Sequence, residues 1–239
     1  MQLRHDALEV IDLIDDIEAT IYNWYETEPT GSFTRACENE EGVVEATILG
    51  NSESWTFTNC EVGTLNYGPV LLNGTYLYVE SKIENGERSS DIFKISGTLL
   101  DSGDELKIQG QVDWTDRYRV QGDETSLQFG ALEFLLGDRY VAASNLTSKT
   151  VRGDESMFYA LSGKLIGSAI DGYVTVSTPT QLRAPIGSQC REEGVVRIEG
   201  EGFAEIRYGT STGTSDWALI EVNGNRGKAL TCAEAWDMF

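Results

Sequence analysis

The sequence has little of three kinds of residue: histidine, proline and the basic residues. Its 239 residues include 1 His and 4 Pro, and its 18 Lys and Arg are outnumbered by 39 Asp and Glu, for a formal net charge of −21. Because His5 is the only histidine, Ser-His-Asp and Cys-His catalysis would have to recruit a residue near the N-terminus. A histidine-based metal site is excluded, and we expect His5 to be a surface residue.

The shortage of Lys and Arg bears on partners. Nucleic-acid binding depends on basic residues that neutralise phosphates, and the sequence shows no basic cluster. An anionic membrane surface would repel the chain for the same reason. No apolar run approaches the roughly 18 to 20 residues that a membrane-spanning helix needs. We therefore predict no nucleic-acid partner and no transmembrane segment, and the acidic surface is either simply well solvated or binds divalent cations or basic partners.

Motifs that carry chemistry are also missing. Gly200-Glu201-Gly202 lacks the third glycine and the strand-to-helix setting of a dinucleotide fingerprint. Among 39 acids some pair will have a spacing suited to glycoside hydrolysis, so that signal carries little information. Two segments, 101–105 and 223–227, resemble calcium loops, but hairpin turns account for both better. The sequence therefore predicts no enzyme, no cofactor and no metal site.

The N-terminal region has the pattern of a helix. Over residues 3 to about 25, apolar side chains recur at three- and four-residue steps, and acidic residues occupy most of the other face. The apolar face is formed by Val10, Ile14, Ile17, Ile21 and Trp24. We expect this face to pack on the core; the alternatives are a lid over a pocket or an oligomer contact. Pro29 and Gly31 indicate that residues 26–36 are a linker.

From Cys37 onward the apolar period changes from helical to two, which is typical of strands with one wet face. The expected strands cover residues 43–49, 54–62, 70–80, 92–100, 105–114, 127–136, 157–166, 170–178, 194–198, 204–208 and 217–222. Turn residues separate them at short intervals, at Asn73-Gly74, Asn85-Gly86, Ser102-Gly103-Asp104, Gly122-Asp123 and Asn223-Gly224.

Short strands without intervening helices predict a mainly β fold, an antiparallel meander that forms a sandwich or a partly open barrel, with one N-terminal amphipathic helix. Residues 1–36 would hold the helix and linker, and residues 37–239 the β domain. The segment from Cys37 to Val44 is echoed by the segment from Cys190 to Val196. This echo suggests two similar halves, 37–150 and 151–239, although similar strand-and-turn chemistry would produce it as well.

The four cysteines, Cys37, Cys60, Cys190 and Cys232, allow three pairings. The spacing favours Cys37 with Cys60 and Cys190 with Cys232, because each pair brackets a tryptophan in one of the echoed segments. No CxxC is present, so two disulfides are favoured over a zinc site or free thiols. Disulfides indicate an oxidising compartment, in which case an export signal would have been removed ahead of Met1.

Five aromatic residues lie on expected strands: Trp55, Tyr76, Tyr78, Trp114 and Trp217. Exposed aromatic side chains on strands are commonly used to bind sugars. Most of these five are expected to fill the core instead.

Several turn-and-strand segments resemble those of uncharacterised exported β-rich proteins and lipoproteins of Gram-negative bacteria. They are Phe57-Thr58-Asn59-Cys60, Leu72-Asn73-Gly74-Thr75, the stretch from Ile170 to Thr178, the stretch from Gly194 to Gly200, and Trp236. The chain departs from that pattern at residues 223–227, where an acidic Asp/Gly turn is expected. The resemblance implies an extracytoplasmic location, either periplasmic, anchored at the outer membrane or secreted, and it transfers no catalytic residue.

Three functions remain open. The leading hypothesis is a non-enzymatic extracytoplasmic binding or structural module of unknown specificity, with an unidentified protein or apolar small-molecule partner. The alternative is a periplasmic carrier of an apolar ligand, with the N-terminal helix as its lid. The third is an acid-pair hydrolase, which would place two carboxylates in a cleft flanked by aromatic side chains.

Overall fold

The computed structural model describes residues 30–38, 41–64, 67–119, 122–168, 172–188, 190–213 and 217–232, together with residues 19 and 234. Apart from Ala19, the predicted N-terminal helix lies outside these residues, and so does His5. None of the helices in the described part of the chain is long and apolar enough to cross a membrane.

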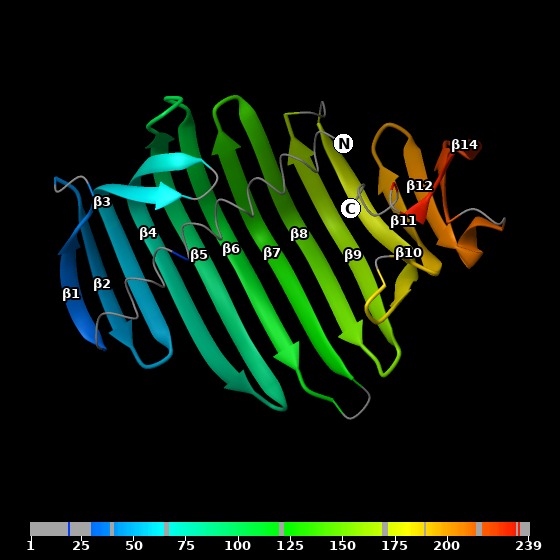
Figure 1. The fold of residues 1–239 in the computed structure, drawn as a ribbon, viewed down its shortest axis with the longest axis horizontal. Helices are drawn as coiled ribbons and strands as arrows, with labels where there is room; N and C mark the ends of the chain where they lie inside the picture. Colours follow the sequence, from blue (N-terminus) through cyan, green and yellow to red (C-terminus); the bar gives the residue numbers. More distant parts are fainter. Residues whose placement is uncertain are drawn as a thin grey trace.

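The described chain forms one sheet of 14 strands, in which each strand pairs with its neighbours in sequence and every pair is antiparallel (Figure 1). The strands are β1 (Gly31–Ala36), β2 (Val43–Leu49), β3 (Ser52–Thr64), β4 (Gly68–Ile83), β5 (Gly86–Leu99), β6 (Glu105–Arg117), β7 (Asp123–Leu136), β8 (Arg139–Arg152), β9 (Ser156–Gly167), β10 (Tyr173–Pro185), β11 (Glu193–Glu199), β12 (Phe203–Gly209), β13 (Ala218–Val222) and β14 (Asn225–Leu230). A short 3-10 helix, η1 (Thr210–Thr212), follows β12.

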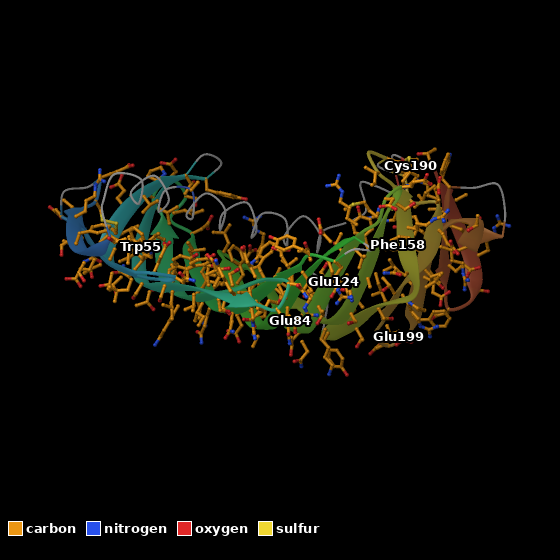
Figure 2. All side chains as sticks on the ribbon, turned by 90° about the horizontal axis from the view of Figure 1, so that it is seen from below. Trp55, Glu84, Glu124, Phe158, Cys190 and Glu199 are labelled. Carbon is orange, nitrogen blue, oxygen red and sulfur yellow. A yellow bond between two sulfur atoms is a disulfide. The ribbon has the colours of Figure 1, made fainter. Side chains whose placement is uncertain are left out.

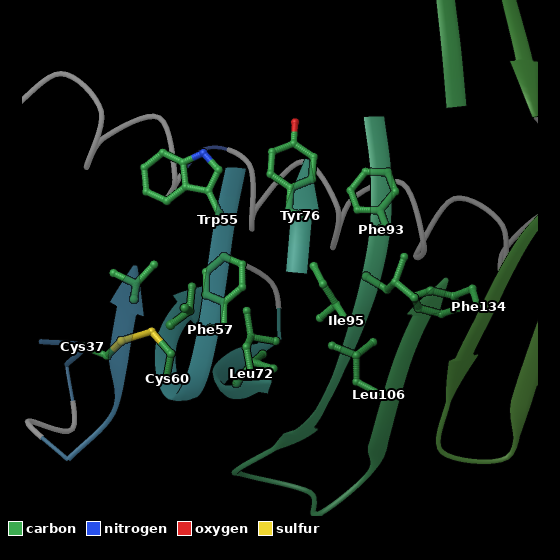
Figure 3. Packing of buried hydrophobic residues seen from close by; sticks show 14 of the residues in the cluster. Cys37, Trp55, Phe57, Cys60, Leu72, Tyr76, Phe93, Ile95, Leu106 and Phe134 are labelled. Atoms are coloured by element: carbon green, nitrogen blue, oxygen red, sulfur yellow. A yellow bond between two sulfur atoms is a disulfide. The ribbon is translucent and has the colours of Figure 1, made fainter. Parts of the chain in front are cut away.

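The two-residue period gives this sheet two different faces. The inner face carries the buried apolar side chains, and the outer face carries most of the charged ones. A row of aromatic residues on the inner face crosses β3, β4 and β5 at Trp55, Tyr76 and Phe93, which are direct cross-strand neighbours (Figure 3). The Tyr76 and Phe93 rings stack with centroids 5.2 Å apart. Fully burying a side chain of this size stabilises a fold by about 1.5–3 kcal/mol.

The buried side chains form two clusters on the inner face. The larger one runs from Cys37 to Leu136 and includes Trp55, whose exposed fraction is 0%. The smaller one runs from Val176 to Leu230 and includes Tyr208. The boundary predicted between residues 150 and 151 falls inside β8, so the sheet itself is continuous at that point.

A line of backbone irregularities crosses the sheet. Asn59 in β3 and Asn145 in β8 have positive φ angles of 46° and 50°, and Gly74, Gly110 and Gly163 have φ angles of 121°, 141° and 145°. The registers of β3 with β4, β6 with β7 and β8 with β9 shift at these points. Bulges and glycine bends of this kind increase local twist and curvature. We call this line the crease, and the sheet that it crosses is visibly curved in Figure 2.

Two disulfides hold the two ends of the sheet. Cys37, just after β1, is bonded to Cys60 in β3, and Cys190, between β10 and β11, is bonded to Cys232, just after β14. The Cα atoms are 5.3 and 5.4 Å apart, within the usual range for a disulfide. These are the pairings that the spacing favoured.

Several expectations about the fold need correction. The mainly β antiparallel meander is confirmed, but its strands form one continuous sheet, not the two stacked sheets of a sandwich, and the sheet is not closed. Within the expected linker 26–36, Gly31–Ala36 form β1. Asn73-Gly74 is not a turn, because it lies inside β4, where the Asn73 side chain accepts a hydrogen bond of 2.9 Å from the Asn59 backbone N–H. β8 and β14 were not expected as strands.

Candidate functional site

A groove on the outer face lies where β4, β5 and β6 pass the crease. Its volume is about 460 Å³, which falls within the roughly 300–1,000 Å³ of typical small-molecule sites. Polar and charged residues of the outer face line it: Thr75, Lys94, Ser96, Glu105, Lys107 and Gln109. Gly74, Ile95 and Ile108 complete the lining. We call this feature the outer groove.

The backbone around Gly74 determines the form of this groove. A Cβ atom at Gly74 would lie 2.0 Å from the Lys94 carbonyl oxygen of β5, which no real side chain tolerates. Thr75, Lys94 and Gln109 are direct neighbours across β4, β5 and β6, so their side chains share one face. The strands therefore bring these three side chains together although they are far apart in sequence.

The outer groove is rich in hydrogen-bond donors. Lys94, Lys107 and Gln109 offer ammonium and amide groups, and Glu105 is the one carboxylate among its lining residues. Lys107 Nζ lies 3.4 Å from Glu133 Oε2, and both side chains are about half exposed, so this pair contributes little stability. Most of the lining surface is nevertheless apolar, so it suits a ligand that combines acceptor groups with apolar parts, and it holds no pair of carboxylates for acid-base catalysis.

A smaller hollow lies on the inner face over β4, β5 and β6. Its volume is about 130 Å³, and it is lined by Tyr78, Glu80, Glu87, Arg88, Ser89, Trp114 and Asp116. Glu87 and Asp116 are cross-strand partners, so two carboxylates do stand beside aromatic side chains. The volume is nevertheless well below the roughly 300 Å³ at which ligand sites begin. The hollow is therefore a poor fit for the two sugar rings that an acid-pair hydrolase must hold.

Next to this hollow, Asp91 is buried on the apolar face with an exposed fraction of 7%. The Tyr76 hydroxyl donates a hydrogen bond of 2.8 Å to Asp91 Oδ1. Burial raises the pKa of Asp91, and hydrogen bonds from Tyr76 and Trp114 oppose that rise. Burial and the charge of Glu80 likewise raise the pKa of Tyr78.

On the outer face, three basic side chains surround one carboxylate. Glu124 Oε2 lies 3.0 Å from Lys149 Nζ and 3.2 Å from the Arg119 guanidinium, and Glu124 Oε1 lies 3.7 Å from the Arg117 guanidinium. The hydrogen bond from Lys149 is the main cause that lowers the pKa of Glu124. We call these four residues the Glu124 cluster. The sequence was expected to hold no basic cluster, and this small one was missed because Lys149 is remote from the other residues in the chain.

The five aromatic residues singled out in the sequence have different surroundings. Trp55 and Tyr76 are buried in the core, as expected for most of them. Tyr78 and Trp114 line the inner hollow, and Trp114 is 40% exposed. Trp217, just before β13, is 50% exposed.

Neither calcium-like segment has the form of a calcium loop. Residues 101–104 connect β5 to β6, and the Ser102 hydroxyl donates a hydrogen bond of 2.8 Å to Asp104. Asn223 and Gly224, with φ angles of 49° and 77°, form the tight turn between β13 and β14. Within the described ranges no group of three or more His, Cys, Asp or Glu side chains is placed to hold a metal ion.

The predicted lid face, Val10, Ile14, Ile17, Ile21 and Trp24, lies outside the described residues and stays a prediction. No family model, no curated protein and no solved structure matches this chain. The resemblance to exported bacterial proteins therefore remains an expectation from the sequence.

Proposed function

We propose that this protein is a non-enzymatic extracytoplasmic binding module that holds a polar ligand in the outer groove. The observation that carries the proposal is a groove of about 460 Å³ whose lining combines Lys94, Lys107 and Gln109 with a single carboxylate. Donors of this kind favour a ligand rich in acceptor oxygens. The two disulfides support the extracytoplasmic part, because such bonds persist in oxidising compartments.

The compartment and the ligand are tested on the same sample, the protein exported to a bacterial periplasm. In a non-reduced intact mass, two disulfides lower the mass by about 4 Da relative to the reduced chain. An unshifted mass would count against the extracytoplasmic assignment.

The ligand is sought by native mass spectrometry of that sample after incubation with a periplasmic extract. We expect additional mass that disappears on denaturation and that is missing from the variant Lys94→Ala/Lys107→Ala. The matched control is Lys164→Ala, since Lys164 is also exposed but lies over the Tyr173 ring in the other half of the sheet. A ligand that the double variant retains would put the site elsewhere, and a ligand-free wild-type protein would overturn small-molecule binding.

The apolar inner face favours a second candidate, the carrier of an apolar ligand. Leu72, Phe93 and Ile108 lie on one side of a single sheet and are at most 4% exposed, so a carrier would have to uncover this apolar face to admit its ligand. In this alternative the predicted N-terminal helix is the lid, and Ile14→Asp or Ile17→Asp should abolish retention of an apolar ligand. Asp15→Asn, on the opposite face of that helix, is the matched control. Retention unchanged in both Ile variants would eliminate the carrier.

A further inference from the structure

The Glu124 cluster has more positive charge than its own carboxylate can neutralise. Among the described residues, three cations face one carboxylate, which leaves a local excess of two positive charges in a chain whose formal net charge is −21. Two guanidiniums and one ammonium offer about 13 N–H donors, whereas a carboxylate accepts roughly four hydrogen bonds. Most donors of the cluster therefore point to solvent or to a further acceptor.

The exposure of these side chains places the unused donors at the surface. The side chains of Arg117, Arg119 and Lys149 are 47%, 52% and 43% exposed, while that of Glu124 is only 8% exposed. A solute that approaches the outer face thus meets the cations first and the carboxylate behind them. Glu124 is the second residue of β7, and in Figure 2 it lies between the labelled Trp55 and Cys190 along the row of strands.

Strand pairing explains why these cations gather on one face. Arg117 in β6 is the cross-strand partner of Glu124 in β7, and Lys149 pairs with the residue two positions further along β7. The preceding residue in β6, Asp116, points to the inner face, where it accepts a hydrogen bond of 2.6 Å from Thr125. Because side chains alternate along a strand, the Asp116 carboxylate lies on the opposite side of the sheet from the Arg117 guanidinium.

Other ion pairs on the outer face have no excess of cations. Arg183 lies 3.0 Å from Glu192, and Arg88 lies 3.4 Å from Asp113, each as one cation to one carboxylate. Arg197 and Arg207 share three carboxylates, those of Glu199, Glu205 and Glu221. Among the ion pairs of the described residues, the Glu124 cluster is the one with more cations than carboxylates. Surface ion pairs contribute little to stability, about 0–1 kcal/mol, so stability alone is a weak reason to place three cations at one point.

We propose that Arg117, Arg119 and Lys149 form a binding site for a dianionic oxyanion group, that of a phosphate monoester, for which inorganic sulfate is a dianionic analogue, with Glu124 as the residue that positions the three cations. A dianion matches the excess of two charges, and guanidinium groups bind the oxygens of phosphate and sulfate through paired hydrogen bonds. This site is independent of the outer groove and stands whether or not that groove binds a ligand.

The test is a titration of the intact, oxidised protein with inorganic phosphate and with sulfate at fixed ionic strength, followed by NMR of the arginine Nε–Hε groups. We expect saturable shifts at Arg117 and Arg119. Arg117→Gln and Arg119→Gln should each weaken binding about tenfold, because each removes a charge-assisted hydrogen bond. The matched control Arg183→Gln should leave the affinity unchanged. The absence of saturable shifts in the folded wild-type protein would overturn the proposal.

The negative charge of Glu124 has its own readout. Glu124→Gln raises the local excess from two to three charges while keeping an oxygen that accepts from Lys149, so phosphate should bind several-fold more tightly. A purely structural ion-pair network gives no such gain, and unchanged or weaker binding would contradict the charge argument. Sedimentation with phosphatidic acid and with phosphatidylcholine vesicles distinguishes the sources of the phosphate monoester. Recruitment to phosphatidic acid vesicles alone, lost in Arg119→Gln, identifies a lipid headgroup, and no recruitment alongside phosphate binding identifies a soluble ester.

Discussion

At the scale of single residues, Asp91 is a buried carboxylate on the inner face of the sheet. Its neighbours across the strands are Tyr78 and Val112, and the Tyr76 hydroxyl is 2.8 Å from its Oδ1. A buried carboxylate loses hydration, which disfavours its charged form and raises its pKa. Because the folded-state pKa is above the unfolded value, the stability contribution of the Asp91 proton is present at low pH and is lost as pH rises.

The raised pKa of Asp91 gives a prediction for the variant Asp91→Asn, because an asparagine side chain does not titrate. The unfolding free energy of the wild type minus that of the variant should be largest below the unfolded pKa of about 3.8 and fall as pH rises through the higher folded pKa. Urea unfolding at a series of pH values between about 3 and 8 measures this difference. The loss of the hydrogen bond from Trp114 would shift this free-energy difference by the same amount at every pH, and would leave its dependence on pH unchanged. A difference that is flat or rises with pH would contradict the raised pKa.

At the scale of secondary structure, the crease depends on glycines that no other residue replaces without strain. A Cβ at Gly110 would lie 2.0 Å from the Ala131 carbonyl oxygen of β7, and Gly110 has a φ of 141°. Gly130, in β7, has nothing within 4 Å of its Cβ position. Position 130 therefore has room for a side chain and position 110 has none, although both glycines lie at the crease.

Gly110→Ala should accordingly destabilise the protein by about 3 kcal/mol or more, since strained backbone and a backbone clash add to each other. Gly130→Ala, the matched control, should be neutral or slightly stabilising. Urea unfolding with both disulfides intact measures the two differences. Equal effects of the two substitutions would show that the crease at β6 does not require glycine.

The strands that the sequence revealed are those with large apolar residues at alternate positions, such as Glu105–Arg117, where Leu106 and Ile108 are buried. β8 was not predicted from the sequence because its inner-face positions include the small or polar residues Ala143, Ser148 and Thr150. A bulge at Asn145 also interrupts the two-residue period. β1 and β14 are short, and only Leu230 among the residues of β14 is buried. Edge strands bury few apolar side chains, so the alternation of apolar and polar residues is weak in their sequences.

At the scale of the whole molecule, the two disulfides secure the ends of a long sheet whose order follows the chain. The cysteines of the two bonds are separated by 23 and 42 residues. In the chain-entropy account, each disulfide adds roughly 3–4 kcal/mol to the free energy of unfolding, and the two contributions differ by only about 0.5 kcal/mol. Packing therefore decides which bond matters more, and Cys60 has an exposed fraction of 0% whereas Cys190 is half-buried.

We expect Cys37→Ala/Cys60→Ala to lower the unfolding free energy more than Cys190→Ala/Cys232→Ala, because the first double variant also leaves a cavity in the core. Urea unfolding of the two double variants, with the reduced wild type as the control without a cavity, separates the two causes. Equal losses in both variants, or no loss on reduction, would contradict this account.

The sequence by itself determined the mainly β class, most strand positions and the favoured cysteine pairing. These follow from local rules, since alternation reports which residues of one strand share a face. The tertiary structure alone decided that the strands form one curved sheet, because sheet closure depends on register shifts and bends that alternation does not encode. It also decided the functional candidates. Arg117 and Lys149 meet at Glu124 only because β7 lies between β6 and β8, and long-range strand pairing sets that order.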